Sequence, residues 1–364
     1  MKFGQFISVI LLAAIVGIAS NVAFSYLSTE KQSDDEIKFE KFLSENWEDG
    51  LEKNPYFASL LGDKRFDDKV SSNSQFAFYE NRDYEEYVIS VLDSINPENL
   101  SDENKLNYRL IRLDYEVSLE GRKYPSFYMR LNQRGGVQDY YDYANRLNFA
   151  TESDYLNWFE RVKGYTQNVK NSLINNREGL SKGYTQPRLV TEGVVSQIES
   201  LLSADIDSHP YLRAFLGSEE VLGADNAQEL ISEVKTYILE ELNPAYQELV
   251  TFLREEYLPQ SRAGIGIKEV PNGREWYEYL ARYHTTTNLT PDQIHEIGLQ
   301  EVARIRSEME DVMKSVAWEG DFRSFLEFLR TDPQFYYETG EELLDAYRAM
   351  SKKIDARSEE HTSE

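Results

Sequence analysis

Apolar residues recur at intervals of three and four positions along most of the chain after residue 30, as expected for helices with one buried side. The first such pattern consists of Phe39, Phe42, Leu43, Trp47 and Leu51. It should end at Asn54-Pro55, because a residue that precedes proline disfavours the helical conformation. Ser101 and Thr151 precede acidic residues and predict the starts of two further helices. In the helix that begins near Ser101, one side consists of Leu106, Leu110 and Leu113.

A longer apolar pattern spans residues 227–257 and contains Pro244. Proline has no backbone N–H and its ring clashes with the preceding turn, so we expect a kink or a break there. Two more helices are predicted at residues 321–330 and 340–354. Alternation with period two, which is typical of strands, is confined to residues 124–131 and 188–190. The sequence therefore predicts an all-α fold with minor β structure, in one helical body from residue 31 to residue 356.

Thr290-Pro291-Asp292-Gln293 predicts the start of another helix. The Thr290 hydroxyl can accept from the backbone N–H of Gln293, whose side chain can accept from the N–H of Thr290. We expect this helix to direct its apolar side toward the core and to use Gly298 for the close approach of a neighbouring helix. That side consists of Ile294, Ile297, Val302, Ile305, Met309 and Val312.

His295-Glu296 in the same helix has the form of the first half of a zinc-peptidase motif. Such a motif requires His-Glu-x-x-His, because two histidines four residues apart point the same way and bind one metal ion. The fifth position here is Leu299, so the second ligand is missing. His284 lies across the helix start and cannot replace it by its spacing. We therefore predict that His295 is a partly buried helix histidine, and we assign no catalytic residue and no metal ligand.

The composition of the chain excludes several classes of function. The formal net charge of −25 argues against nucleic-acid binding, because a basic surface supplies most of that affinity. The same charge disfavours docking on anionic lipid. Because cysteine is absent from the 364 residues, disulfides, thiol catalysis and Cys-type zinc sites are excluded. The sequence also contains no glycine loop with the spacing of a phosphate site.

The N-terminus has the pattern of an export signal. Lys2 precedes an apolar run from Phe6 to about Leu27. Small residues near Ala19 and Ala23 favour cleavage, although the run is also long enough to be an uncleaved anchor that spans a bilayer. Either form places the body in the periplasm or on the outer face of the inner membrane of a bacterium, and any membrane contact is expected only through this segment. Residues 1–30 are therefore left out of the predicted fold.

Tyr283-His284-Thr285-Thr286-Thr287 groups an aromatic and several polar side chains just before a predicted helix start. The hydroxyl groups can satisfy local backbone groups in a turn. They can also line a cleft, where hydroxyl groups and a helix N-terminus hold a carboxylate. Both interpretations remain open at this point, and these five residues are the candidates for substrate contact.

Many stretches resemble a bacterial family called domain of unknown function 885. The resemblance rests mainly on Pro271-Asn272-Gly273, on His284-Thr285-Thr286-Thr287 and on Leu289-Thr290-Pro291-Asp292-Gln293-Ile294-His295. Further matching positions are Pro55, Leu61-Gly62-Asp63, Asn132-Gln133, Gly135-Gly136, Pro187-Arg188, Asp332-Pro333 and Leu343-Leu344. Members of this family are mostly helical and often exported, and the family is regarded as one of zinc metallopeptidases. The resemblance covers nearly all of the chain after the targeting segment.

The resemblance implies zinc-dependent peptidase activity for the intact protein, and we do not expect this activity from the present chain by itself. The His-Glu-x-x-His helix of the family lies downstream of the matched region, so zinc is implied for the intact protein and no cofactor for this part of it. We expect the N-terminal part of an exported zinc-dependent peptidase that acts on small peptides and is inactive by itself. The alternative is a non-catalytic helical binding or scaffold protein of the cell envelope.

The last eight residues predict that the natural reading frame continues. Residues 357–364, Arg-Ser-Glu-Glu-His-Thr-Ser-Glu, match the in-frame translation of a common sequencing-library adapter, which favours an artefact over a frayed polar tail. Resequencing the source DNA beyond Asp355 should therefore recover further coding sequence that contains His-Glu-x-x-His. A genuine stop codon after Glu364 would refute this expectation.

Overall fold

The computed structural model describes residues 32–361 of the chain. These residues fall into two compact units that meet in the sequence between Thr286 and Thr287, and each unit is described by itself. The predicted targeting segment, residues 1–30, and the last three residues of the predicted artefact lie outside the described residues. Within the described residues, no helix combines the length and the apolar character needed to cross a bilayer.

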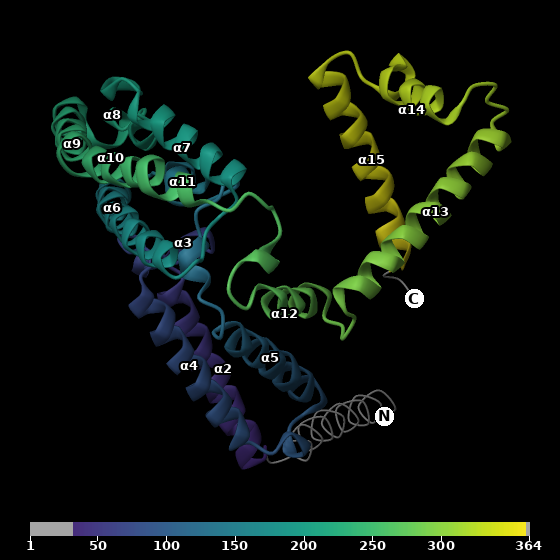
Figure 1. Ribbon diagram of the computed structural model, residues 1–364, viewed down its shortest axis with the longest axis horizontal. Helices are drawn as coiled ribbons and strands as arrows, with labels where there is room; N and C mark the ends of the chain where they lie inside the picture. Colours follow the sequence, from purple (N-terminus) through teal and green to yellow (C-terminus); the bar gives the residue numbers. More distant parts are fainter. Residues whose placement is uncertain (1–31, 362–364) are drawn as a thin grey trace, which may run out of the picture. The chain divides into compact units, whose positions relative to one another are not determined.

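The regular secondary structure of residues 32–361 is helical, which confirms the all-α prediction. Their β structure amounts to two isolated bridges, Asn132 with Gly135 and Pro187 with Arg262. The helices of the first unit are α2 (Asp34–Lys53), α3 (Pro55–Leu60), α4 (Gln75–Asp93), α5 (Asp102–Gly121), α6 (Glu152–Ser181), α7 (Arg188–Leu202), α8 (Glu219–Leu222), α9 (Ala224–Tyr237), α10 (Asn243–Phe252), α11 (Leu258–Gln260) and α12 (Gly273–Thr285) (Figure 1).

The two segments predicted to be extended are helical, so that prediction was wrong. Ser126–Met129 forms a 3₁₀ turn, and Arg188 begins α7. Phe127 and Tyr128 are adjacent in sequence and are both buried, which a tight turn allows and an alternating strand does not. A short alternation of apolar and polar residues therefore did not decide the backbone conformation.

Helices α2, α4 and α5 pack around a small apolar core (Figure 1). The apolar side predicted for α2 is confirmed at Phe39, Phe42 and Leu51, which are buried, whereas Trp47 is 53% exposed. The helix ends at Lys53, just before Asn54-Pro55, as its sequence predicted. Regular spacing of apolar residues was thus sufficient to find this helix and its inner side.

Helix α5 begins after Ser101 as predicted, but its inner side is not the leucine side. Leu106, Leu110 and Leu113 are 57%, 56% and 51% exposed. Instead, the Tyr108 hydroxyl donates to the carbonyl of Leu92 in α4, 3.1 Å away. This hydrogen bond joins the Tyr108 side of α5 to α4, so Tyr108 rather than the leucines faces the core.

A larger core lies among α6, α7, α9 and α10. Residues 227–257 form an almost continuous helix in which the π-helical turn Ile238–Leu242 precedes α10. Pro244 lies in the first turn of α10, where its missing N–H is not needed. The helix is therefore not split at Pro244; it departs from α-helical geometry in the π-helical turn just before this residue. A second π-helical turn, Leu253–Tyr257, likewise precedes Pro259.

One side of α6 is polar although it is buried. Arg161, Asn168, Ser172 and Asn175 are each no more than 4% exposed. Their partners lie in α3 and in residues 61–74, which connect α3 to α4 and are called the α3–α4 loop below.

Arg161 binds this part of the chain through several carbonyl groups. Its Nε donates to the carbonyl of Lys69 at 3.1 Å, and its Nη2 donates to the carbonyls of Pro55 and Phe66 at 3.1 and 3.3 Å. Nη2 also donates to the Ser59 hydroxyl at 2.6 Å. These bonds give the buried guanidinium group its partners and add a further donor to the carbonyls of Pro55 and Phe66, which also accept from the Ser59 hydroxyl and the Lys69 N–H.

The same arrangement continues along α6 toward its C-terminal end. The Asn168 side chain accepts from the backbone N–H of Asn73 at 3.1 Å and donates to the carbonyl of Ser71 at 3.0 Å. The Asn175 side chain donates to the carbonyl of Asn73 at 2.9 Å. The α3–α4 loop is thus held along α6 by side chains rather than by a backbone ladder.

The second unit consists of α13 (Pro291–Ser315), α14 (Phe322–Thr331) and α15 (Gly340–His361). The predicted start of α13 is confirmed, since the Thr290 hydroxyl accepts from the Gln293 N–H at 3.2 Å and the Gln293 side chain accepts from the Thr290 N–H at 2.9 Å. These reciprocal bonds satisfy two donors that the first helical turn leaves free. The two helices predicted nearer the C-terminus are confirmed as α14 and α15.

The expectation that the apolar side of α13 faces a core was wrong for the described residues. No residue of α13 is buried. A Cβ built on Gly298 would have no neighbour within 4 Å, so no helix approaches closely there. His295 is exposed rather than partly buried. Periodicity identifies the apolar side of a helix, but it does not supply the surface that covers it.

Replacing Arg161 should destabilise the first unit strongly. Arg161→Met removes donors from buried carbonyl groups of the α3–α4 region, so we expect the free energy of unfolding to fall by about 3–5 kcal/mol. Urea unfolding of the full chain measures this change. Arg177→Met in the same helix is the matched control, because Arg177 is half exposed and its ion pair with Glu256 is 4.0 Å long. Equal effects of the two substitutions would contradict the role given to Arg161.

Candidate functional site

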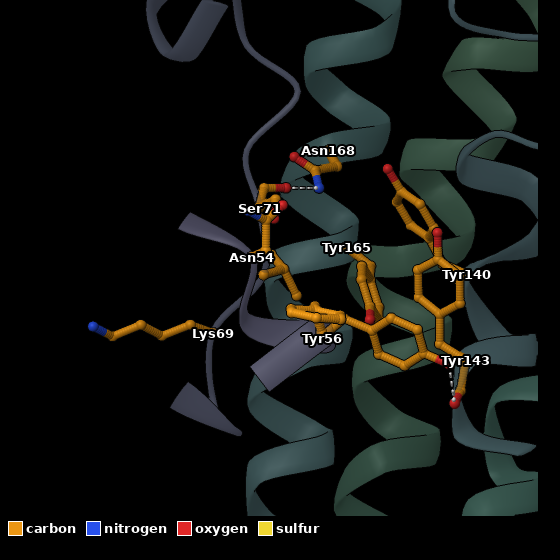
Figure 2. A pocket seen from close by; sticks show the side chains of 10 residues that line it. Asn54, Tyr56, Lys69, Ser71, Tyr140, Tyr143, Tyr165 and Asn168 are labelled. Atoms are coloured by element: carbon orange, nitrogen blue, oxygen red, sulfur yellow. Dashed lines mark hydrogen bonds between the residues drawn. The ribbon is translucent and has the colours of Figure 1, made fainter. Parts of the chain in front are cut away.

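Four tyrosine rings meet where α3, α6 and the 3₁₀-helix Val137–Arg146 come together (Figure 2). Tyr56 stacks on Tyr143 with ring centroids 4.4 Å apart and an angle of 22° between the planes. Tyr140 and Tyr165 are 4.5 Å apart, and Tyr143 and Tyr165 are 6.0 Å apart. The Tyr56 hydroxyl also donates to the carbonyl of Tyr143 at 3.3 Å. Residues from three separate segments thus form one aromatic cluster.

The 3₁₀-helix explains why two of these rings are neighbours. Such a helix has three residues per turn, so Val137, Tyr140, Tyr143 and Arg146 lie along one line of it. Runs of this length are uncommon because their hydrogen bonds are poorer than those of an α-helix. The start of the run is anchored by Tyr246 of α10, whose hydroxyl donates to the carbonyl of Val137 at 2.5 Å. The anchor holds Val137 in the core and directs the rest of the line along the aromatic cluster.

Three adjoining hollows surround Tyr143, and together they are called the Tyr143 cleft below. The first, of about 250 Å³, is lined by the tyrosines and by Asn54, Ser71 and Asn168. Figure 2 shows these polar side chains on one side of the rings, with Lys69 pointing away from them. The second, of about 280 Å³, extends to Arg146, and the third, of about 380 Å³, extends to Arg130. All three share Tyr143 as a lining residue.

The tyrosine hydroxyls of the cleft are hydrogen-bond donors at neutral pH. Burial raises the pKa of Tyr140 to about 12, and it also raises the pKa values of Tyr143 and Tyr165. The rings therefore stay neutral and offer both apolar faces and polar edges. Such a surface suits a small ligand that has flat or apolar parts and polar ends.

The charged groups of the cleft are of both signs and are unevenly placed. The hollow beside Arg146 is also lined by Arg134, Asp139 and Asp142. Burial raises the pKa of Asp139, and the nearby Asp142 adds to this shift. The hollow beside Arg130 is lined by no aspartate or glutamate.

The predicted substrate residues Tyr283, His284, Thr285, Thr286 and Thr287 lie elsewhere, at the C-terminal end of α12 and just beyond it. The Thr285 and Thr286 hydroxyls donate to the carbonyls of Ala281 and Thr285 at 2.8 and 2.7 Å. The Thr287 hydroxyl accepts from the N–H of Leu289 at 3.3 Å. The hydroxyl groups thus serve a local turn. These contacts do not test substrate binding, so all five residues stay candidates for substrate contact, and Tyr283 and His284 are exposed.

The described residues do not fit a zinc site. Among them, no cluster of three or more histidine, aspartate or glutamate side chains is arranged to hold a metal ion. His295 is exposed on α13, in the second unit. His209 is only 1% exposed, and its ring stacks on Tyr211 rather than joining a group of carboxylates.

A family model described as "Bacterial protein of unknown function (DUF885)" matches residues 55–364. The chain belongs to this family. The match runs from α3 to the end of the chain, so it includes segments of both units of this DUF885 protein. The resemblance inferred from the sequence is thereby confirmed.

A solved structure shares the fold of this DUF885 chain. It is the crystal structure of a candidate lipoprotein from Colwellia psychrerythraea, with a TM-score of 0.72 and 20% sequence identity. The similarity covers 84% of this chain and 56% of that one, so this chain spans little more than half of the solved structure. At this identity the likeness shows the fold alone. No curated protein matches the chain.

Sequence analysis missed the Tyr143 cleft in this DUF885 chain. Tyr140-Tyr141-Asp142-Tyr143 follows shortly after Gly135-Gly136, which already belonged to the family resemblance. That density of tyrosines beside a glycine turn was the available signal. It was hidden because the chain contains 25 tyrosines and most can be explained by packing.

His209 predicts a specific pH dependence of stability. Burial lowers its pKa from 6.5 to about 4, and the neighbouring Asn243 side chain opposes this shift only in part. The folded state therefore binds fewer protons than the unfolded state between these values, so stability is complete above pH 6.5 and is lost as the pH falls toward 4. The contribution at stake is at most about 3 kcal/mol.

The measurement is urea unfolding of the wild type and His209→Gln from pH 8 to about 4.5. The difference in unfolding free energy between the two proteins should change below pH 6.5 and stay constant above it. Carboxylates titrate in both proteins and cancel in this difference. A constant difference across the whole range would contradict the assignment.

Proposed function

We propose that this chain is the ligand-binding part of an exported DUF885 protein and that the Tyr143 cleft holds a short peptide. The observation that carries this proposal is the set of three adjoining hollows around Tyr143. Their volumes lie near the lower end of the range for small-ligand sites, and their walls combine ring faces with amide, hydroxyl and charged groups. A short peptide presents apolar side chains, amide groups and ends of opposite charge, so each kind of wall has a counterpart in it.

The peptidase chemistry that the resemblance implies is proposed for the intact protein and not for the described residues. Residues 32–361 offer no cluster of metal donors, so we derive no catalytic step through zinc. The chain spans 56% of the solved structure, which supports the proposal that the metal donors belong to a further part of the polypeptide. The chain as it stands is then expected to bind peptide without hydrolysing it.

Export is supported by the apolar N-terminal run and by the description of the solved structure as a candidate lipoprotein. No cysteine occurs in the 364 residues, so we do not extend lipid attachment through cysteine to this chain. The proposed location is the periplasm or the outer face of the inner membrane.

A second candidate function is that of a non-catalytic binding or scaffold protein of the cell envelope. The observation that favours it is the number of exposed apolar side chains in the second unit. Val302 of α13 is 67% exposed, and Tyr347 and Met350 of α15 are 66% and 58% exposed. Large exposed apolar surfaces are typical of protein–protein contacts.

Peptide binding by the full chain separates these functions. A pool of tripeptides with varied central residues should bind, as detected by saturation-transfer NMR, and should remain intact. Tyr143→Ala should weaken binding about fivefold to tenfold, because it removes an aromatic contact shared by all three hollows. Tyr283→Ala is the matched comparison from the site predicted at the end of α12, and it should have little effect.

Three outcomes would contradict parts of this proposal. A larger effect of Tyr283→Ala would transfer the substrate site to the end of α12. Absence of tripeptide binding would refute the peptide function and leave the scaffold candidate. Stoichiometric zinc together with peptide hydrolysis would refute the placement of the chemistry outside the described residues.

A further inference from the structure

Three arginine side chains at the Tyr143 cleft pair with no carboxylate in the described part of the chain. Arg130 and Arg134 line the largest of the three hollows of the cleft, and Arg134 and Arg146 line the one beside it. Arginines nearby do pair with acidic residues, as Arg122 does with Glu85 at 2.5 Å. The chain contains 64 acidic residues, so a supply of partners is not limiting. Unpaired arginines at one cleft therefore indicate an anionic partner from outside the chain.

Arg130 is exposed to solvent at the cleft, and its charge lies near that of a second arginine. The surrounding protein desolvates its guanidinium group and lowers its pKa; Tyr140 opposes this shift, and the neighbouring Arg122 adds to it. Arg122 is itself paired with Glu85. A bound carboxylate would return to Arg130 the hydrogen bonds and the negative charge that its surroundings lack.

The placement of acidic residues gives the cleft a polarity across Tyr143. The Arg130 hollow is lined by no acidic residue, whereas the neighbouring hollow contains Asp139 and Asp142. Arg134 stands at a tight turn in which the N–H of Gly135 donates to the carbonyl of Asn132 at 3.2 Å. An anionic group is favoured on the Arg130 side. The other hollow is of mixed charge, since Arg134 and Arg146 line it too, and its aspartates are the groups there that suit a cationic end.

We propose that Arg130 and Arg134 bind the free C-terminal carboxylate of a short peptide whose N-terminal end lies toward Asp139. This inference rests on the proposed peptide-binding function and narrows it to peptides that are recognised by their free C-terminus. A guanidinium group matches a carboxylate with two parallel hydrogen bonds, which a lysine ammonium group does not reproduce. The tyrosine faces then contact the side chains that precede the C-terminus.

The experiment compares two tripeptide pools that differ only at the C-terminus, one with free carboxylates and one with carboxamides. Affinities for the full chain are measured by competition in saturation-transfer NMR. The wild type should prefer the free-acid pool at least tenfold. Arg130→Gln should abolish this preference, and Arg130→Lys should retain only part of it. The matched control is Arg109→Gln, which removes an exposed arginine of α5 that does not line these hollows.

Each outcome decides between the two proposals. If neither pool binds, the peptide function fails and this inference fails with it. If both pools bind equally, or if Arg130→Gln keeps the preference for the free acid, the peptide function stands and the carboxylate assignment is overturned. Inorganic phosphate that binds as tightly as the free-acid pool would also overturn it, since the arginines would then form a general oxyanion site. The ratio of the two affinities is measured within one protein, so a small loss of stability in a variant does not affect it.

Discussion

The first unit depends on hydrogen bonds between the polar side chains of α6 and the backbone groups of the α3–α4 loop. Neither set of polar groups could be buried without the other. The polar side of α6 carries a guanidinium group and several amides into the interior, at a cost of several kcal/mol if they lacked partners. The α3–α4 loop carries carbonyl and N–H groups that have no neighbouring strand. Arg161, Asn168 and Asn175 bind these groups, so each set offsets the cost of burying the other. Helix and loop therefore have to be ordered together.

The same contact produces the Tyr143 cleft. Arg161 holds the carbonyl of Pro55, and the next residue, Tyr56, lies against Tyr143. Asn168 holds the loop one helical turn beyond Tyr165, and its side chain forms part of the wall. The tyrosine rings are thus positioned by chain segments that contact α6 on one side and the 3₁₀-helix on the other. A site built in this way needs little rearrangement to receive a ligand, which lowers the entropic cost of binding.

Local signals along the sequence predicted local structure well. Proline and a hydroxyl cap placed the end of α2 and the start of α13, because each acts on backbone groups within a single turn. Pro244 marked the π-helical turn before α10, although the helix is not split there. Predictions failed where the partner of a helix had to be known. The leucine side of α5 and the apolar side of α13 both have helical spacing, yet neither is buried in the described residues.

The sequence by itself determined the all-α class, several helix ends and membership of the DUF885 family, because these follow from propensities and spacings within one segment. Only the tertiary structure decided which side of each helix is covered and where a ligand could bind. The Tyr143 cleft joins Tyr56, Tyr140 and Tyr165, which are far apart in the chain and come together only after the α3–α4 loop is bound along α6. Hydrogen bonds between distant segments produce no periodic pattern in the sequence of either segment. They therefore cannot be predicted from the two segments taken separately.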